Sequence, residues 1–424
     1  MTPRRLPGPL TGLAGTVDVP ASKSLTNRAL IASAVAGGGR IVRPLVCDDT
    51  RVLAAALAAA GWAVHWEGDI EIGSRDLPAD QVVLQLGNSG TGARLVLGLL
   101  AACPGRTVVD GSGRLRERPM APLLRSLEAL GAVLHCTDDR LPVEVVGTVL
   151  EGGHVEIRPG VSSQFVSSLL LAAPLMRRGI DLDVVGSLPS APYLDLTMEV
   201  LGGFGGEVSA SPDRRRWWVS PRPLRPSTYE VAGDWSAAAF FLAAVAIAGG
   251  TVEIGPLDPG SRQGDREVVR LLADAGLQVD WNGDRLTARG PITEPLTADL
   301  EHAPDLFPAL VAVAACALPG SRFTGLDHLV HKESNRLAVM VENLGRLGAG
   351  ITCDGPRLEI AEPLRADVDT PRKVTAAGDH RIAMAMAVAA LGAGPLDLDD
   401  AACVSKSFPA FWADWHRLTG SASG

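Results

Sequence analysis

Hydrophobic and polar positions along the chain repeat one pattern six times. In each case a polar cluster is followed at once by a run of small apolar residues that is long enough for about three helical turns. Ser, Thr, Asn and Asp, which dominate the clusters, are the residues preferred at helix N-termini. The pattern predicts six helices, which begin near residues 22, 88, 162, 234, 305 and 379.

The six predicted helices are almost evenly spaced. Successive starts lie 66, 74, 72, 71 and 74 residues apart, and a period of about 70 residues held along the whole chain indicates internal duplication. Each repeat also carries a second helix pattern that ends at a glycine and is followed by short strands. We therefore predict three repeats in each half, with a crossover near Val231.

Composition narrows the class of protein. The chain has 424 residues, of which 46% are hydrophobic and 21% are charged, as expected for a globular protein of two or more domains. The net charge of -9 argues against a general binder of nucleic acids or anionic membranes, but it allows a local basic pocket. The six cysteines are scattered without a CxxC pair, which favours reduced thiols in a cytoplasmic protein.

The sequence shows no pattern typical of export or of membrane insertion. Pro3, Pro7 and Pro9 interrupt any apolar signal segment near the first residue. The longest apolar run, residues 237–248, is shorter than the roughly 20 residues that span a bilayer. We expect this run to form a buried core helix.

Cations gather where the predicted helices begin. Lys23 and Arg28 accompany the first helix start, Arg94 the second and Arg381 the sixth. A helix N-terminus carries free N–H groups and a partial positive charge, so cations there are unfavourable unless an anion lies among them. These positions predict a pocket for phosphates and carboxylates.

Other cations occupy turns between the repeats. Arg118 lies in a glycine-flanked segment, Lys406 precedes a final helix, and Lys332 and Arg336 are four residues apart, which predicts one shared helix face. Taken singly, each could be part of a solvated charged face, and each polar cluster could be an ordinary helix cap. The sequence contains neither a Walker lysine motif nor a GxGxxG segment, and no spacing typical of a metal site.

Eight motifs, taken together, resemble the family of 5-enolpyruvylshikimate-3-phosphate synthase (3-phosphoshikimate 1-carboxyvinyltransferase). In chain order they are SKSLTNRAL, LGNSGTGARL, RERPM, SSQFVSSLLLAAP, SAPYLDLTMEV, HKESNRL, GDHRIAMA and SKSFPAFW. The resemblance implies an α/β (α+β) fold with two domains, an inside-out α/β barrel of six βαβαββ units. The implied domains are residues 1–19 with 232–424, and residues 20–231, with the active site in the cleft between them.

The resemblance implies a transferase of the shikimate pathway to chorismate and the aromatic amino acids. The 5-hydroxyl of shikimate 3-phosphate adds to C2 of phosphoenolpyruvate, and the tetrahedral intermediate then eliminates phosphate. No cofactor or metal is implied, and a monomer is the family expectation. Glyphosate, which occupies the phosphoenolpyruvate site in this family, is expected to inhibit, because Gly90 has no side chain that would intrude there.

The resemblance also implies a role for each matching residue. Lys23 would shuttle a proton, Asp305 would take the hydroxyl proton, and Glu333 would deliver a proton to the methylene carbon. The residues implied to bind shikimate 3-phosphate are Lys23, Ser24, Arg28, Ser162, Ser163, Gln164, Ser190, Tyr193, Asp305, His328 and Lys332. Those implied to bind phosphoenolpyruvate are Lys23, Gly90, Arg118, Gln164, Arg336, Arg381 and Lys406, with Arg94 in a supporting place.

Three positions depart from the family pattern and leave alternatives open. Ala21 replaces a glycine, and His328 stands where an asparagine or another polar residue is common. Asn335 replaces an aspartate that could orient Arg336 or Lys332. A paralogue that acts on another cyclitol acceptor is one alternative, and a degenerate homologue that binds a phosphometabolite without turnover is another. The transferase that acts on UDP-N-acetylglucosamine is disfavoured, because Lys23 is followed by a serine and residues 111–119 hold no cysteine.

Overall fold

The chain folds as two units, only one of which is a continuous stretch of the sequence. A computed structural model describes residues 1–317 and 319–420. The unit that we call the terminal unit contains both chain ends, Met1–Pro20 and Ala232–Gly424, whereas the middle unit is the continuous segment Ala21–Val231. The chain therefore passes from one unit to the other twice, after residue 20 and after residue 231.

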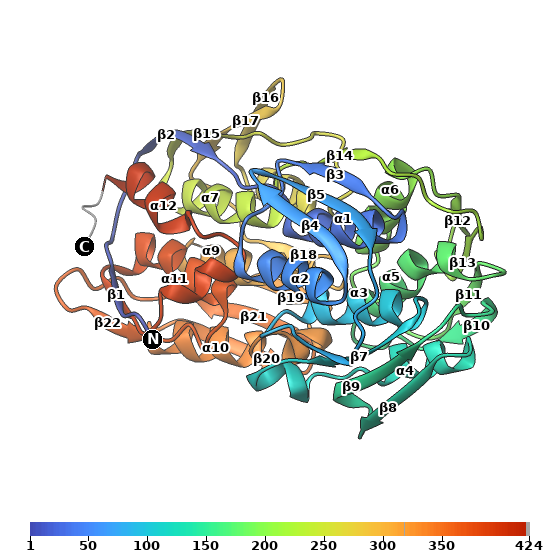
Figure 1. The fold of residues 1–424 in the computed structure, drawn as a ribbon. Helices are drawn as coiled ribbons and strands as arrows, with labels where there is room; N and C mark the ends of the chain where they lie inside the picture. The colour runs from blue at the N-terminus through green and yellow to red at the C-terminus, as the bar shows by residue number, and fades with distance from the viewer. Residues whose placement is uncertain (318, 421–424) are drawn as a thin grey trace. The chain divides into compact units, whose positions relative to one another are not determined.

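Three similar four-stranded sheets build the middle unit (Figure 1). Each contains one parallel pair of strands, and the remaining neighbours are antiparallel. In order across the sheets the strands are β14 (Thr228–Glu230), β3 (Gly39–Val42), β5 (Asp69–Arg75) and β4 (Trp62–Glu67); β6 (Val82–Gln85), β7 (Gly105–Asp110), β9 (Arg140–Gly147) and β8 (Val133–Thr137); β10 (Gly153–Ile157), β11 (Ile180–Val184), β13 (Arg216–Val219) and β12 (Val208–Ala210).

The terminal unit repeats this arrangement with strands from both ends of the chain. β1 and β2, which precede the first crossover, each pair with a strand from the second half of the sequence. The strands are β16 (Gln278–Asn282), β17 (Arg285–Gly290), β15 (Gly250–Gly255) and β2 (Leu13–Asp18); β18 (Thr297–Asp299), β19 (Ser321–Thr324), β21 (Arg357–Glu362) and β20 (Gly350–Asp354); and a three-stranded sheet of β1 (Arg4–Leu6), β23 (Leu396–Leu398) and β22 (Arg372–Val374).

Three helices pack together in the interior of each unit, whereas the other three bury only part of their surface. The helices of the middle unit are α1 (Lys23–Val35), α2 (Asp48–Ala59), α3 (Gly90–Ala101), α4 (Ala121–Ala129), α5 (Gln164–Ala172) and α6 (Pro192–Gly203). Those of the terminal unit are α7 (Trp235–Ala248), α8 (Glu267–Asp274), α9 (Phe307–Ala317), α10 (Arg336–Arg346), α11 (His380–Ala393) and α12 (Phe411–Thr419). Helices α1, α3 and α5 contact one another, as do α7, α9 and α11.

The six helices predicted from the repeated pattern are confirmed as α1, α3, α5, α7, α9 and α11. Three of them carry the expected cap, because the side chains of Ser89, Asp234 and Asp379 accept backbone N–H bonds from the first turn. Helix α9 instead follows one turn of 3₁₀ helix, Pro304–Leu306 (η4), which contains Asp305. The starts of these helices therefore hold most of the predicted site residues.

Helix α7 confirms the prediction of a buried apolar helix at residues 237–248. Every residue of α7 except Ser236 and Ile247 is buried, so the helix is hydrophobic on all sides and lies in the core of the terminal unit. Among the described helices, none combines the length and the apolar character that crossing a bilayer requires.

Candidate active site

Arg28 is held rigidly inside the middle unit by neutral oxygen atoms. Its guanidinium donates from Nε to Thr197 Oγ1 (2.9 Å), from Nη1 to the Ser24 carbonyl (3.0 Å) and from Nη2 to Ser167 Oγ (3.2 Å). The side chain is almost fully buried and lies over the ring of Tyr193, 5.8 Å from its centre. Three bonded nitrogens on a buried side chain fix the direction of the positive charge.

Burial lowers the pKa of Arg28 to about 10, and the nearby tyrosines offset only part of this effect. A guanidinium in this state still carries its charge at neutral pH, but it is destabilised by the loss of water. An anion that bound here would relieve that cost. The predicted residues Ser24, Arg28 and Tyr193 are thus brought together around one poorly solvated cation.

Lys23 begins helix α1 and has an acidic partner that the sequence analysis missed. Its Nζ donates to Asp49 Oδ2 at 2.9 Å, and both side chains are about nine-tenths buried. Asp49 lies in the first turn of α2, where an acid also interacts favourably with the helix dipole. The ammonium group is therefore held in one place by a second helix.

The first turns of α3 and α5 meet through Arg94. Arg94 Nη1 donates to Gln164 Oε1 (2.8 Å) and to Ser162 Oγ (3.3 Å), and the Gln164 side chain donates in turn to Thr91 Oγ1 (2.9 Å). Ser163, which is buried, precedes α5 directly. The structure therefore brings the predicted residues Ser162, Ser163 and Gln164 to the start of α3.

Gly90 and Arg118 are in direct contact. A Cβ atom built on Gly90 would lie 2.3 Å from Arg118 Nη1, so a larger residue here would displace the guanidinium. Arg118 itself is buried, and its Nε has no hydrogen-bond partner among residues 1–317 and 319–420. A buried donor of this kind is costly unless a ligand satisfies it.

Ser190 stands just before α6 in an unusual backbone conformation. Its φ of 60° is the left-handed region that non-glycine residues rarely adopt, and its side chain is buried. Its carbonyl accepts the Tyr193 N–H at 3.1 Å, which closes the turn that leads into the helix. The strained turn fixes Ser190 beside Tyr193, the other predicted residue of this segment.

In the terminal unit, one guanidinium binds three carboxylates. Arg336 donates from Nη1 to Asp305 Oδ1 (2.7 Å), from Nη2 to Glu333 Oε2 (2.8 Å) and from Nε to Asp379 Oδ2 (2.7 Å). Burial alone would lower the pKa of Arg336, but the three negative charges outweigh it and hold that pKa well above its usual value. Asp305 and Glu333, which are 28 positions apart in the sequence, are thus attached to neighbouring nitrogens of one side chain.

Asp305 is also bound by a second arginine. Its Oδ2 lies 2.8 Å from Arg381 Nη2. Burial would raise the pKa of Asp305, but the charges of Arg381, Arg336 and Lys332 outweigh burial and hold it well below its usual range. The carboxylate is therefore ionised. Among these cations, Arg381 and Arg336 contribute more to the charge state of Asp305 than Lys332 does.

Two lysines adjoin the same carboxylates. Lys406 Nζ lies 3.9 Å from Glu333 Oε1, and Lys332 acts electrostatically on both Asp305 and His328. The prediction that Lys332 and Arg336 share a helix face is wrong. Lys332 ends the 3₁₀ helix Asp327–His331 (η5), and α10 begins only at Arg336.

Asn335 explains this break in the helix. Its side chain caps α10 by accepting the Ala338 N–H at 3.2 Å, so it starts a new helix rather than orienting a cation. The carboxylate that is missing at this position is replaced around Arg336 by Asp305, Glu333 and Asp379. The departure at Asn335 therefore leaves Arg336 fully bound.

His328 is buried and uncharged. Burial, with a further contribution from Lys332, lowers the pKa of the imidazole to about 3. Its Nε2 has no hydrogen-bond partner within the described part of the chain. A neutral ring can offer one donor and one acceptor, which suits a hydroxyl-bearing ligand better than a second cation would.

Sequence reasoning missed two other acids in the terminal unit. Asp379 was expected only as a cap, yet it also binds Arg336. Asp265, in the short turn Gly264–Arg266 (η3), accepts a hydrogen bond from Ser236 Oγ. Burial, followed by the charge of Asp305, raises the pKa of Asp265 to about 7. Its position after Gln263-Gly264 gave no sign of this contact.

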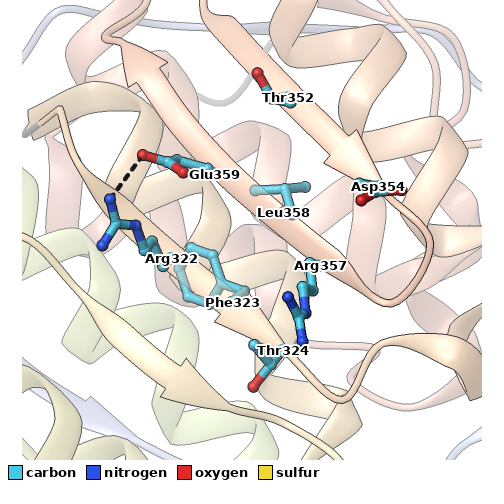
Figure 2. A pocket seen from close by; sticks show the side chains of 8 residues that line it. All are labelled: Arg322, Phe323, Thr324, Thr352, Asp354, Arg357, Leu358 and Glu359. Carbon is cyan, nitrogen blue, oxygen red and sulfur yellow. Dashed lines mark hydrogen bonds and ion pairs between the residues drawn. The ribbon is translucent and has the colours of Figure 1, made fainter.

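A separate cavity of about 350 Å³ lies on the sheet that contains β19, β20 and β21 (Figure 2). Arg322 and Glu359, which lie opposite each other on β19 and β21, form an ion pair at 3.2 Å, and none of the predicted site residues lines the cavity. Among the described residues, no group of three or more His, Cys, Asp and Glu side chains could hold a metal ion. The candidate residues instead form two groups, one in each unit.

Comparison with known proteins identifies the family. The model of EPSP synthase (3-phosphoshikimate 1-carboxyvinyltransferase) matches residues 8–415. The chain belongs to the EPSP synthase family. A 3-phosphoshikimate 1-carboxyvinyltransferase of Syntrophobacter fumaroxidans is 38% identical over 97% of this chain and 98% of its own length. One of Methanoregula boonei is 38% identical over 95% of this chain and 96% of its own length.

Solved structures support the same fold. An EPSP synthase from Acinetobacter baumannii has a TM-score of 0.78 at 26% identity, covering 98% of each chain. The enolpyruvyl transferase NikO from Streptomyces tendae has a TM-score of 0.75 at 20% identity, over 98% of this chain and 96% of its own, which shows the fold alone. The chain therefore has the predicted enolpyruvyl transferase fold, an inside-out α/β barrel of six repeated units.

In this EPSP synthase family member, lysine is rare except at the candidate site. The sequence has 39 Lys and Arg residues in total, and only four of them are lysines. Three of the four, Lys23, Lys332 and Lys406, are candidate site residues, and the fourth, Lys373, is exposed. Arginine supplies almost all the other cations, and the two side chains differ, since an ammonium group is compact and can lose its proton whereas a guanidinium is planar and stays charged.

Proposed function

We propose that the two groups of residues carry out one reaction, the transfer of the enolpyruvyl group of phosphoenolpyruvate to the 5-hydroxyl of shikimate 3-phosphate. The hydroxyl oxygen bonds to C2 of the enol while the methylene carbon gains a proton. The resulting tetrahedral intermediate then loses that proton and phosphate, which restores the double bond. Residues of both units act on the same bound substrates in this proposal.

The arrangement of Asp305 and Glu333 on Arg336 is the observation that supports this function best. Addition across a double bond needs a base at the attacking hydroxyl and an acid at the neighbouring carbon, each within hydrogen-bond reach. The two carboxylates occupy adjacent nitrogens of one guanidinium, at 2.7 and 2.8 Å. Asp305 takes the hydroxyl proton, and Glu333, beside the Lys406 ammonium group, delivers a proton to the methylene carbon.

Substrate binding itself makes Asp305 a stronger base. In the free protein Arg336 and Arg381 hold the pKa of Asp305 well below its usual range, and such a carboxylate accepts protons poorly. Arg336 and Arg381 are also the residues that bind phosphoenolpyruvate in this proposal. When its phosphate and carboxylate engage the guanidinium groups, their pull on Asp305 weakens and its pKa rises. The base is thus activated only when the second substrate is present.

The middle unit supplies the anion-binding half of the reaction. Arg28 with Ser24, Tyr193 and Ser190 binds shikimate 3-phosphate, together with Ser162 and Ser163 at the start of α5. From the terminal unit, His328 and Lys332 contribute to the same substrate. Arg118 beside Gly90 binds phosphoenolpyruvate, and Lys23 and Gln164 contact both substrates. Free N–H groups at the helix starts add to the attraction.

A phosphate-release assay tests the proposed function. Purified protein is mixed with shikimate 3-phosphate and phosphoenolpyruvate, each alone and both together, and inorganic phosphate is followed. Release that requires both substrates is expected. Binding of shikimate 3-phosphate without release would instead identify a degenerate homologue, and turnover only with another cyclitol would identify a paralogue.

Glyphosate inhibition is a second test of the phosphoenolpyruvate site. Gly90 places no side chain beside the Arg118 guanidinium, which is the group proposed to bind the phosphonate or the carboxylate of glyphosate. Competition between glyphosate and phosphoenolpyruvate is the expected result, and an unchanged rate at saturating glyphosate would contradict the assignment of these residues.

The chain is further proposed to act as a cytoplasmic monomer without a cofactor. One copy supplies the base, the acid and the cations that the reaction needs, and both substrates are metabolites that carry several negative charges. Neither nucleic acid nor membrane takes part in this proposal. Light scattering of the purified protein, with and without both substrates, measures the oligomeric state directly.

A further inference from the structure

Arg94 joins three segments of the middle unit that carry proposed substrate-binding residues. It lies on α3, and only 2% of its surface is exposed. Besides Gln164 and Ser162 at the start of α5, its guanidinium reaches the carbonyl of Pro119 through Nη2 at 3.2 Å. Its carbon Cζ lies 4.7 Å from the ring centre of Phe165, which closes one face of the group.

These bonds decide which way the Gln164 amide points. A guanidinium only donates hydrogen bonds, so the atom of Gln164 that faces Arg94 Nη1 at 2.8 Å must be the oxygen. The amide nitrogen then donates one hydrogen to Thr91 Oγ1 at 2.9 Å. Within residues 1–317 and 319–420 the second N–H has no further hydrogen-bond partner, and it would be available to a ligand. With Oε1 bound to Arg94, Gln164 offers a donor, which is what phosphate and carboxylate groups require.

The hydrogen bond from Arg94 to the Pro119 carbonyl fixes a second segment, the one that carries Arg118. Pro119 directly follows Arg118, whose guanidinium lies against Gly90. Arg94 therefore holds the backbone of the segment that carries Arg118 and, through another nitrogen, the side chain of Gln164. A single side chain sets the geometry of two groups that bind different parts of the substrates.

We propose that Arg94 is a positioning residue that fixes Gln164 as a hydrogen-bond donor and fixes the backbone beside Arg118. This inference rests on the proposed function, because it takes Gln164 and Arg118 to be substrate-binding residues. Arg94 has no contact with substrate in this proposal. Its loss therefore raises the KM for both substrates while kcat changes little.

A double-mutant cycle with Arg94→Met and Gln164→Met tests the proposal. Each single substitution is expected to raise both KM values about tenfold, consistent with one misplaced hydrogen bond to a charged group. In the Gln164→Met background, Arg94→Met should raise the KM for shikimate 3-phosphate by less than twofold, because the amide that it orients is gone. Equal effects of Arg94→Met in both backgrounds would overturn the proposal.

Gln164→Glu provides an independent check. A carboxylate at this position pairs with Arg94 and keeps the shape of the side chain, but it has no N–H to donate. We expect thermal stability at least equal to that of the unsubstituted chain, with KM values raised more than in Gln164→Met because like charges repel. KM values near those of the unsubstituted chain would show that Gln164 accepts rather than donates, which contradicts the inference.

Arg75 offers a matched control in the same unit. Its guanidinium also donates to two backbone carbonyls, those of Ala60 and Pro104, and lies 4.2 Å from the ring centre of Trp62, but it contacts none of the candidate residues. Arg75→Met should lower Tm and leave both KM values unchanged. If Arg94→Met does not fold, Arg94→Lys, whose single ammonium group cannot reach Gln164 and Pro119 together, replaces it in the cycle.

Failure of the inference and failure of the proposed function give different results. If the chain without substitutions releases no phosphate, the proposed function fails before any variant is compared. If that chain turns over but the cycle shows no coupling between Arg94 and Gln164, the function stands and the positioning role does not.

Discussion

The two units stabilise their buried cations in opposite ways. In the middle unit, Arg28 and Arg94 donate to hydroxyl, carbonyl and amide oxygens. In the terminal unit, Arg336 and Arg381 are bound to carboxylates at 2.7–2.8 Å. Lys23, which pairs with Asp49, is the exception in the middle unit.

In the proposed function, this difference favours anion binding in the middle unit and proton transfer in the terminal unit, with Lys23 again as the exception. Neutral oxygens orient a cation without cancelling its charge, so the middle unit keeps positive potential for an incoming phosphate. Carboxylates cancel the charge of the terminal cations, and they are themselves the groups that can accept or deliver protons. The sequence shows Lys and Arg in both units, but it does not show whether their partners are neutral oxygens or carboxylates.

The largest expected effect tests whether each unit holds an indispensable group. Lys23→Met in the middle unit and Glu333→Ala in the terminal unit should each lower turnover by about 10³-fold or more, as expected when a proton-transfer group is lost. Circular dichroism should show an intact fold. Near-normal phosphate release from either variant would show that its role is misassigned, and Lys373→Met, at an exposed lysine, serves as the control.

A stability measurement tests the contrast between neutral and charged partners. Arg336→Met removes the cation that three buried carboxylates share, with Arg381 left beside Asp305 and Lys406 beside Glu333, and should cost about 3–5 kcal/mol of unfolding free energy. Arg28→Met removes a cation that burial disfavours, and we expect an unchanged or higher stability in the absence of substrates. Denaturant unfolding of both variants measures this, and equal losses would refute the distinction.

Lysine-to-arginine substitutions test whether the three candidate positions require lysine rather than arginine. Lys23→Arg, Lys332→Arg and Lys406→Arg each preserve the charge but replace a compact ammonium group by a planar one that is not deprotonated in proteins. We expect kcat/KM to fall by about 10²-fold in each, whereas Lys373→Arg should have no effect. If all four variants behave alike, the distribution of lysine carries no functional meaning.

The smallest effect concerns acid stability in the terminal unit. The pKa of His328 is about 3 in the folded chain, whereas its ordinary value is 6.5. Between these two pH values, the unfolded chain therefore binds a proton that the folded chain does not bind. Stability should therefore fall as the pH drops below about 6.5, by about 2 kcal/mol between pH ~7 and ~5. In His328→Gln this loss should disappear, while His302→Gln, at an exposed histidine, should retain it.

The helices could be predicted from the sequence, but the ion pairs could not. The apolar runs after residues 22, 88 and 234 determine helices because helix periodicity is local, and α1, α3 and α7 begin there. Arg336 binds Asp305 and Asp379, which are 31 and 43 residues away from it in the sequence. No local pattern specifies contacts at that distance.

The same reason explains the errors and omissions at the site. Spacing of four residues placed Lys332 and Arg336 on one helix, but the Asn335 cap starts α10 between them. The motif SKSLTNRAL marked Lys23 as a candidate, yet its partner Asp49 belongs to another helix. The motifs identified the candidate side chains, but the contacts in the folded chain determine which charged partner each of them has.

The pairing of β1 with β23 has a consequence for protein synthesis. The middle unit is continuous in the sequence and can fold as soon as it leaves the ribosome. Leu6, in contrast, pairs with Leu396, so β1 cannot pair until about 390 further residues have been made. At about 5–20 residues per second, that wait lasts roughly 20–80 s. During this time β1 lacks its native partner, whereas β2 needs only β15, which ends at Gly255.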